Sequence, residues 1–234
     1  MTPPGITPAS AEARALVARP GERFTFSVGY LGIIGARARI AVAAGPAGTL
    51  EFTGDVENTA LLRFVFRVRD RFQSVFSAAE ARTVRTQLWQ QENSFRRYRE
   101  EAFFDDRVVT LERRNDNERT QLVATQGRPW DPLAVLFWIR GQRLEVGDAV
   151  GAPMFANNRQ FEVRAQVTGR EAVRAAGRSW PALRLDAHVF RDGKPISGAD
   201  GTFWVSDDEQ RLPLRGEANT GYGRVTAALD KVDR

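Results

Sequence analysis

The sequence contains no cysteine and a single histidine, His188. The lack of cysteine excludes disulfide bonds and metal sites built on thiolates. One histidine is too few for the usual zinc sites, and it removes most catalytic triads in which a histidine acts as the base. We therefore expect no metal, no cofactor and no catalytic residues, and these absences argue more firmly than any motif that is present.

A long apolar run is also missing. A bilayer-spanning helix needs about 20 consecutive apolar residues, and the 234 residues contain no such stretch. The first residues, Met1 to Gly5, show no basic region followed by an apolar one, so we expect no signal peptide within this sequence. That is compatible with a cytoplasmic protein or with an exported protein whose signal has been removed.

Lysine is scarce, because Lys194 and Lys231 are the only lysines in the chain. Arginine supplies nearly all of the positive charge behind a formal net charge of +5. Such a balance supports weak attraction to anionic surfaces. No nucleic-acid-binding motif accompanies it, so we expect no specific nucleic-acid partner.

The pattern that is present is mainly that of β-strands. Residues 1–20 are rich in proline, alanine and serine and are expected to form a flexible lead-in. From residue 21 on, apolar and polar residues alternate, as in the stretch that holds Phe24 and Phe26, and this alternation is typical of half-buried strands. Residues 21–234 are therefore expected to form a single β-rich domain.

Turn signals between these stretches predict the connections of the sheet. Asp192-Gly193 is a hairpin signal, and Asn157-Asn158 also separates two alternating stretches. No linker and no strict repeat is visible. Many short strands joined in this way predict one strongly curved antiparallel sheet, an open or half barrel, with an apolar concave face.

Residues 130–141 are the exception, because they read as a helix. Asp131 can cap its N-terminus, Pro132 suits its first turn, and Gly141 can end it. Its apolar residues cover both faces, with Leu133, Leu136 and Phe137 on one and Val135, Trp138 and Ile139 on the other. A helix without a polar face is buried on both sides or carries a ligand surface. We expect it to act as a plug or lid against the concave face of the sheet.

This helix supplies the first candidate site. Leu133, Phe137 and Trp138, together with Trp204, are expected to line an apolar pocket for a lipid-like or other amphipathic ligand. The alternative is plain core packing, since a buried aromatic helix is normal.

The second candidate site is a set of arginines. In the expected strand at residues 61–71, Arg67, Arg69 and Arg71 alternate and would project from one face. They could contact anionic lipid headgroups, lipopolysaccharide or polyanionic glycans. The alternative is a solvated sheet face.

Two further polar features carry weaker hypotheses. Asp207-Asp208-Glu209 lies near Arg211, and paired carboxylates can do acid–base work or bind calcium. This stretch lacks calcium-loop spacing, so an acidic turn paired with Arg211 is the alternative. His188 lies on the polar side of its strand and is expected to be exposed or hydrogen-bonded.

Several short motifs follow one another in a fixed order: residues 21–28 with a glycine-rich turn after them, Asp131-Pro132-Leu133 with its apolar helix, Gly147-Asp148, residues 204–208, and Arg211-Leu212-Pro213. This order resembles a family of exported bacterial proteins known as domain of unknown function 3108. The resemblance covers about residues 20–230. It implies a periplasmic or outer-membrane-associated location and a fold similar to the Lol lipoprotein carriers, an open β half-barrel with a helical lid. It carries over no catalytic residues.

Two hypotheses of different classes follow. The preferred one is a non-enzymatic cell-envelope protein that holds a lipid-like or amphipathic ligand in a curved β-sheet. The alternative is a structural or assembly module that binds another protein of an envelope complex. A hydrolase that uses Asp207 and Asp208 is a third reading. An empty pocket of several hundred Å³ favours the first hypothesis, and a filled core with one large apolar surface patch favours the second.

Overall fold

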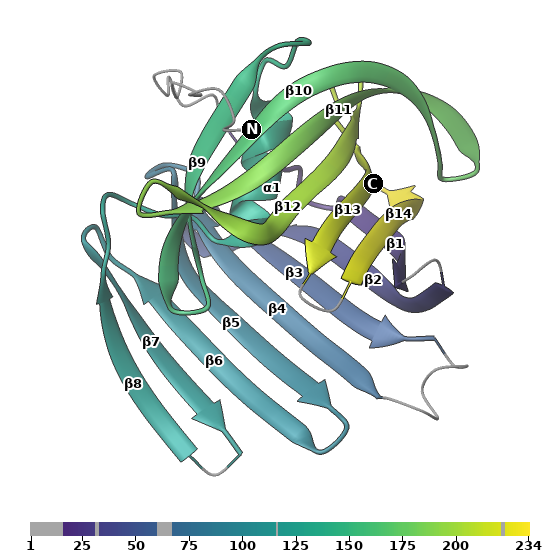
Figure 1. Ribbon diagram of the computed structural model, residues 1–234. Coiled ribbons are helices and arrows are strands. Elements are labelled where there is room, and N and C mark those ends of the chain that lie inside the picture. Colours follow the sequence, from purple (N-terminus) through teal and green to yellow (C-terminus); the bar gives the residue numbers. More distant parts are fainter. Residues whose placement is uncertain (1–15, 31–32, 60–66, 116, 221–222) are drawn as a thin grey trace.

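In the part of the chain that the structure describes, 14 strands form one antiparallel sheet, with one α-helix packed against it (Figure 1). The computed structural model describes residues 16–30, 33–59, 67–115, 117–220 and 223–234. The elements are β1 (Arg23–Tyr30), β2 (Ile33–Ala44), η1 (Pro46–Gly48), β3 (Thr49–Asn58), β4 (Val68–Ser77), β5 (Arg82–Glu92), β6 (Phe95–Phe103), β7 (Arg107–Arg114), β8 (Asn117–Ala124), α1 (Pro132–Gly141), β9 (Ala149–Ala156), β10 (Arg159–Ala175), β11 (Arg178–Arg191), β12 (Lys194–Ser206), β13 (Pro213–Thr220) and β14 (Gly223–Asp233).

The strand order is β8-β7-β6-β5-β4-β3-β2-β1-β14-β13-β12-β11-β10-β9. The first and last strands therefore pair at the centre, and two meanders run outward from them. The sheet ends at β8 on one side and β9 on the other, and the chain crosses between these ends through α1. The predicted fold, an open antiparallel sheet with one short helix, is confirmed.

Local turn chemistry sets much of this pairing. Asn157 and Asn158 have φ values of 51° and 60°, and Asp192 and Gly193 have values of 52° and 74°. Positive φ at both central residues matches the twist of a two-residue hairpin, which is why Asn, Asp and Gly stand there. The predicted hairpin at Asp192-Gly193 is thus confirmed as the connection between β11 and β12.

One strand boundary differs from expectation. The alternation suggested a strand over residues 61–71 and another from residue 72, whereas β4 runs without a break from Val68 to Ser77. Residues 61–66 of the expected strand lie outside the described residues.

Helix α1 begins and ends where the local signals place it. Asp131 is the N-cap and accepts hydrogen bonds from the backbone N–H groups of Leu133 and Ala134, and Pro132 occupies the first turn. Gly141 is the last helical residue. In the described part of the chain, no helix has the length and apolar character needed to cross a membrane.

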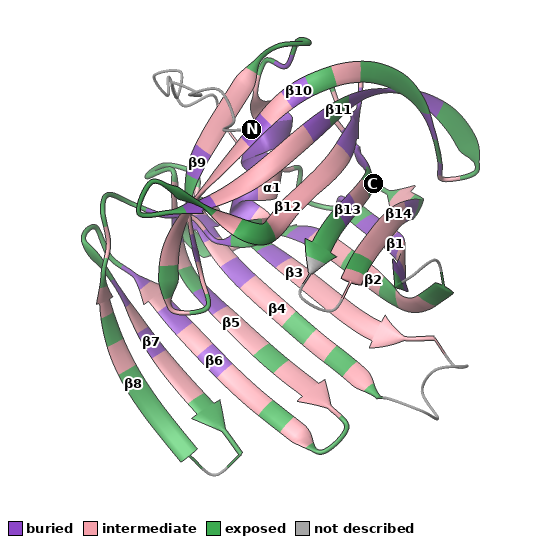
Figure 2. Cartoon of the chain, viewed as in Figure 1, coloured by how far each residue is buried: buried purple, intermediate pink, exposed green. Residues whose placement is uncertain are grey.

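The two apolar faces of α1 pack against different parts of the sheet. Ala134 and Phe137 belong to a core cluster that includes Phe24 and Phe52 from β1 and β3. Val135, Trp138 and Ile139 belong to a second cluster with residues of β9–β12. The helix therefore lies between two core clusters and contributes residues to both. Figure 2 shows the buried residues gathered around it.

The expected lead-in joins the domain before residue 21. Residues 1–15 lie outside the described residues. Leu16 and Ala18 pack against the first core cluster, and the Val17 N–H donates to the carbonyl oxygen of Phe137 at 3.2 Å. The described end of the lead-in therefore packs on the core and on α1.

Candidate functional site

The two ends of the sheet overlap instead of pairing. The tip of the β9–β10 hairpin lies on the inner face of β6–β8, where Arg99 Nη1 donates to Asn157 Oδ1 at 3.1 Å. The next residue, Asn158, donates from Nδ2 to Gln121 Oε1 at 2.6 Å. We call this overlap the seam.

Apolar packing and a side-chain bridge also hold the seam. Phe155 of β9 is fully buried, and its ring meets that of Phe103 edge to face at 5.8 Å. Gln160 Nε2 donates to the Gln126 carbonyl oxygen at 2.8 Å, and its Oε1 accepts from the Gln126 N–H at 2.7 Å. The Gln160 side chain thus takes the place of the backbone hydrogen bonds that would join two paired strands. The two ends of the sheet are therefore held together by a few separate contacts and not by a continuous set of backbone hydrogen bonds.

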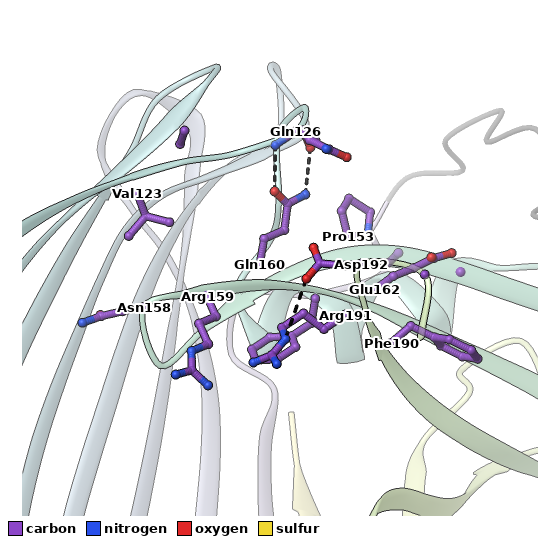
Figure 3. Close-up of a pocket in the computed structure, with 15 residues that line it drawn as sticks. Val123, Gln126, Pro153, Asn158, Arg159, Gln160, Glu162, Phe190, Arg191 and Asp192 are labelled. Carbon is purple, nitrogen blue, oxygen red and sulfur yellow. Dashed lines mark hydrogen bonds and ion pairs between the residues drawn. The ribbon is translucent and has the colours of Figure 1, made fainter. Parts of the chain in front are cut away.

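A groove of about 910 Å³ opens beside these contacts. Figure 3 shows Val123 on one side of it, Arg191 and Asp192 on the other, and the bridge from Gln126 to Gln160 between them. We call it the seam groove; its lining residues are 123, 124, 126, 151–153, 158–162 and 190–193. The volume falls in the range of small-molecule sites.

Most charges of the seam groove are already paired. Arg164 donates from Nε and Nη2 to the two carboxylate oxygens of Glu162, both at 2.7 Å. Arg191 lies 3.9 Å from the carboxylate of Asp192. Among the described residues, Arg159 has neither an ion pair nor a side-chain hydrogen bond, and it is exposed. It is the cation that a ligand can engage without breaking an existing pair.

Apolar and unpaired polar atoms complete the lining. Val123 and Phe161 are half-buried at the groove, and Pro153 is exposed there. The side-chain oxygen of Asn158 is buried and has no hydrogen-bond partner within the described chain. A buried acceptor without a partner loses solvation, which costs stability. The groove itself therefore offers apolar contact and one free cation.

The four residues predicted to bind a ligand lie in the core. Phe137 stacks on Phe52 with ring centroids 4.7 Å apart, and Leu133 packs at the edge of the same cluster. Trp204 also belongs to this cluster, whereas Trp138 belongs to the other one. None of the four lines the seam groove. Their contact with a ligand stays a prediction, and it would require α1 to move away from the sheet.

Away from the helix, the concave face of β5–β8 is mostly polar, apart from the apolar cluster that includes Phe103 and Val108. The expectation of an apolar concave face is therefore wrong for most of β5–β8. Arg99 is 4% exposed on this face and donates to Glu112 Oε2 from Nε at 3.1 Å and from Nη2 at 2.8 Å. Arg97 Nε donates to the same oxygen at 3.0 Å. The alternation of these strands places charged residues on both faces, and pairing compensates their burial.

A buried carboxyl stands beside this network. Glu101 is 5% exposed and accepts a hydrogen bond from Thr86 Oγ1 at 2.8 Å. Burial raises the pKa of Glu101 above its ordinary value, although the hydrogen bond from Thr86 and the charge of Arg99 act in the opposite direction. Perturbed carboxyls mark functional sites in some proteins, but a structural network also perturbs them. Within the described residues, no group of three or more His, Asp or Glu side chains is placed to hold a metal ion.

The predicted arginine set lies on the outer face. Arg69 and Arg71 are exposed on β4, and Arg67 is exposed just before the strand. Arg71 lies 3.6 Å from Asp55. Beside them, Trp89 and Tyr98 place their ring centroids 5.4 Å apart in a shallow depression that Arg69 and Arg71 also line. Contact with an anionic surface stays a prediction.

The acidic turn is held in place as a structural element. Burial by itself would raise the pKa of Asp207, but hydrogen bonds from Arg211 and Arg170, at 3.0 and 2.8 Å, outweigh it and lower the pKa. Asp208 Oδ1 accepts from Ser206 Oγ at 2.7 Å and from the Gln210 N–H at 3.0 Å. A carboxylate kept ionised by two arginines is poorly suited to act as a general acid.

The histidine also has a simple role. His188 is partly exposed, and its Nδ1 lies 2.8 Å from Asp200 Oδ1. It is thus hydrogen-bonded on a polar face, as its position in the strand pattern suggested.

Two groups of buried polar side chains were not predicted from the sequence. Arg140 of α1 binds Glu22 with two hydrogen bonds of 3.1 Å, although 118 residues separate them. Asp131 Oδ2 accepts from Ser74 Oγ at 2.6 Å and from Thr83 Oγ1 at 2.8 Å. The signal in the sequence was the single charged residue, Arg140, inside an otherwise apolar helix.

Comparison with known proteins gives a family and a fold. The family model described as "Protein of unknown function (DUF3108)" matches residues 23–230. No curated protein matches the sequence. A β-barrel-like protein of domain of unknown function DUF1849 from Brucella abortus has a similar structure, with a TM-score of 0.61 and 13% identity over 93% of this chain and 98% of that one.

More remote structures include a candidate exported protein with a YmcC-like fold from Bacteroides fragilis, with a TM-score of 0.35 and 9% identity over 95% of this chain and 100% of that one. A candidate lipoprotein from Parabacteroides distasonis has a TM-score of 0.34 and 8% identity over 92% of this chain and 95% of that one.

Proposed function

Because the chain belongs to the DUF3108 family, whose function is not known, we propose a function from the geometry of the site. The protein is a non-enzymatic component of the bacterial cell envelope that binds an amphipathic ligand with an anionic group in the seam groove. The observation that carries the proposal is the groove itself, which offers apolar side chains and one unpaired arginine within about 910 Å³.

Each part of the ligand is matched to part of the groove. The apolar portion lies against Val123, Pro153 and Phe161, which keep partly exposed apolar surface there. The anionic group pairs with Arg159, whose guanidinium donates hydrogen bonds to carboxylate or phosphate oxygens. The ligand does not need to enter the core beside α1, because both faces of that helix are already packed.

The absence of catalysis is part of the proposal. In the groove, Arg164 binds Glu162, and Arg191 lies 3.9 Å from Asp192. In the acidic turn, Arg211 and Arg170 bind Asp207. No nucleophile and base come together among the groove residues that the structure describes. The envelope location is supported by the resemblance to a family of exported proteins.

We expect Arg159→Glu and Phe161→Ser each to weaken binding of a fluorescent fatty-acid probe about tenfold to a hundredfold. The loss of one charge-assisted hydrogen bond, or of most of the apolar contact made by one side chain, lowers the binding free energy by roughly 1.5–3 kcal/mol. The measurement is probe fluorescence titrated with the purified full chain. Arg143→Glu and Phe104→Ser, which change exposed residues that do not line the groove, are the matched controls.

The proposal fails if the wild-type chain does not bind the probe or if the groove variants bind as tightly as the controls. Loss of binding on Trp138→Ala, with the groove variants unaffected, would instead place the ligand beside α1. Each variant is first shown to be folded by its far-UV circular dichroism and by its urea unfolding midpoint.

The second candidate function, an assembly module, has one observation in its favour. Strand β8 ends the sheet, so one of its edges has no strand neighbour in the described chain, and Leu122 on it is 65% exposed. An exposed edge can accept a strand from another protein. Stoichiometric co-purification of an envelope protein that Leu122→Lys abolishes, without effect on probe binding, would favour this function.

A further inference from the structure

One end of the sheet carries exposed apolar residues at the tip of the β1–β2 hairpin. Ile33 and Ile34 are 65% and 61% exposed, and Tyr30 opposite Ile33 is 43% exposed. Consecutive residues of a strand point to opposite faces. Ile33 and Ile34 therefore leave apolar surface exposed on both faces of β2 at its first residues, which together with Tyr30 we call the tip.

A row of arginines crosses the outer face at the same end. Arg37, Glu57, Arg69, Gln91 and Arg96 lie directly opposite one another on β2 to β6, so their side chains share one face. The three arginines alternate with the other two residues, and neighbouring arginines are thus about 10 Å apart, which is two strand spacings.

These arginines lack carboxylate partners. Arg37, Arg69 and Arg96 are exposed, and within the described residues none of them has an ion pair or a side-chain hydrogen bond. Glu57, the acidic member of the row, is bound by Arg39 at 3.0 Å. Glu92 lies opposite Val68, on the other face. The row therefore keeps an excess of positive charge.

The tip and the row belong to one surface. The Thr59 N–H donates to the Gly35 carbonyl oxygen at 2.9 Å, which ties the end of β3 to the start of β2 beside the isoleucines. On the other side, the Arg67 N–H donates to Asn93 Oδ1 at 2.9 Å and ties β4 to the β5–β6 turn. The arginine row thus runs from the apolar tip across β2 to β6, on one side of the tip.

We propose that this end of the sheet is a docking surface for an anionic lipid bilayer. The isoleucines and Tyr30 enter the boundary between headgroups and acyl chains, and Arg37, Arg69 and Arg96 contact the headgroup phosphates. A second copy of the chain fits less well, because an isologous contact over this surface would bring two unpaired arginine rows together. The proposal is independent of the seam groove, since it uses different residues at a different place in the fold.

The test is flotation of the full chain with vesicles. Wild type is expected to float with vesicles of phosphatidylcholine and phosphatidylglycerol, and to float much less with phosphatidylcholine alone. Ile33→Ser combined with Ile34→Ser is expected to lower the partition coefficient at least about tenfold. Leu122→Ser is its matched control, because Leu122 is equally exposed, at 65%, on β8.

The arginine row is tested by neutralisation. Arg37→Gln, Arg69→Gln and Arg96→Gln together are expected to abolish the preference for anionic vesicles and the salt dependence of wild-type binding. The control with equal loss of charge is Arg119→Gln, Arg143→Gln and Arg174→Gln, all at exposed positions elsewhere.

Three results would overturn the proposal. In the first, wild type ignores anionic vesicles. In the second, each control set weakens vesicle binding as much as its test set, so that net charge or non-specific apolar adsorption explains the binding. In the third, the isoleucine variant leaves vesicle binding intact but lowers the sedimentation coefficient of the chain, so that a second copy covers the tip. Unchanged urea midpoints establish that each variant is folded.

Discussion

Arg140→Met is expected to lower the free energy of unfolding by about 3–5 kcal/mol, because it leaves the carboxylate of Glu22 buried without its partner. The two side chains are 0% and 1% exposed, and two hydrogen bonds of 3.1 Å join them. The guanidinium also donates to the carbonyl oxygens of Arg211 and Gln210, both at 3.1 Å. The pair thus connects the end of α1 to the start of β1 and to the turn before β13.

The expected loss of unfolding free energy is large because, once Arg140 is gone, nothing compensates for the desolvation of the buried Glu22 carboxylate. Replacing both partners should therefore cost less than the sum of the single changes. We expect Glu22→Leu with Arg140→Met to fall short of that sum by at least about 2 kcal/mol. Urea unfolding followed by tryptophan fluorescence measures all three variants.

The control for this experiment lies three positions along the chain, at Arg143. It pairs with Glu145 at the surface, where its side chain is 71% exposed, so Arg143→Met should change stability by less than about 1 kcal/mol. Additive effects of the Glu22 and Arg140 substitutions would show that the ion pair does not couple the helix to β1.

Asp131→Ala should also destabilise the fold strongly, by roughly 3–5 kcal/mol, because one side chain serves several buried groups. Its Oδ1 accepts from the N–H groups of Leu133 and Ala134 at 2.9 and 3.1 Å. Its Oδ2 accepts from hydroxyls of Ser74 and Thr83, so the cap also anchors α1 to β4 and β5. Alanine would leave these donors buried without an acceptor.

The substitution Asp131→Asn separates the effect of the hydrogen bonds that this side chain accepts from the effect of its negative charge. Asparagine retains an acceptor for the helix N–H groups, so the loss of stability should be much smaller than for alanine. Burial raises the pKa of Asp131 above its ordinary value, even though hydrogen bonds from Ser74, Thr83 and the helix N-terminus favour the carboxylate. The folded state therefore holds this proton more tightly than the unfolded state does.

The pH dependence follows from that direction. The stabilising contribution of the protonated carboxyl is fully present below the unfolded-state pKa of about 4 and is lost as the pH rises toward the folded-state pKa. Wild type should therefore lose stability relative to Asp131→Asn as the pH rises above about 4. Unfolding free energies of both proteins across the acid range measure this. A change of the opposite sign would mean that the hydrogen bonds outweigh burial and lower the pKa.

The stability of α1 also matters for the proposed function, because the helix and part of the seam groove lie on the same connection. The connection from β8 to β9 runs through α1 and also supplies Gln126, which bonds to Gln160 at the seam groove. Variants that loosen the helix should therefore be tested for probe binding only under conditions where they are folded. Otherwise, loss of the groove would be mistaken for loss of a ligand contact.

Features that depend on near neighbours in the chain were predictable. The limits of α1 followed from Asp131, Pro132 and Gly141, since capping and first-turn geometry involve residues within a few positions. The hairpin at Asp192-Gly193 followed from its need for positive φ. The assignment of Leu133 and Phe137 to one face, and of Val135, Trp138 and Ile139 to the other, also followed, because a helix has a fixed period. Leu136, expected on the first face, is half-buried and belongs to neither cluster. The open antiparallel sheet was a consequence of many short alternating strands.

Other features depend on residues far apart in the sequence, and only the tertiary structure decided them. Alternation tells which residues share a face, but it does not tell which face curls inward, so the charged concave face of β6 was missed. The overlap of β9–β10 on β6–β8 depends on the curvature accumulated over the whole sheet, which no single strand encodes. The pairing of Glu22 with Arg140 was hidden for the same reason, because a charge gives no sign of its partner until folding brings the two together.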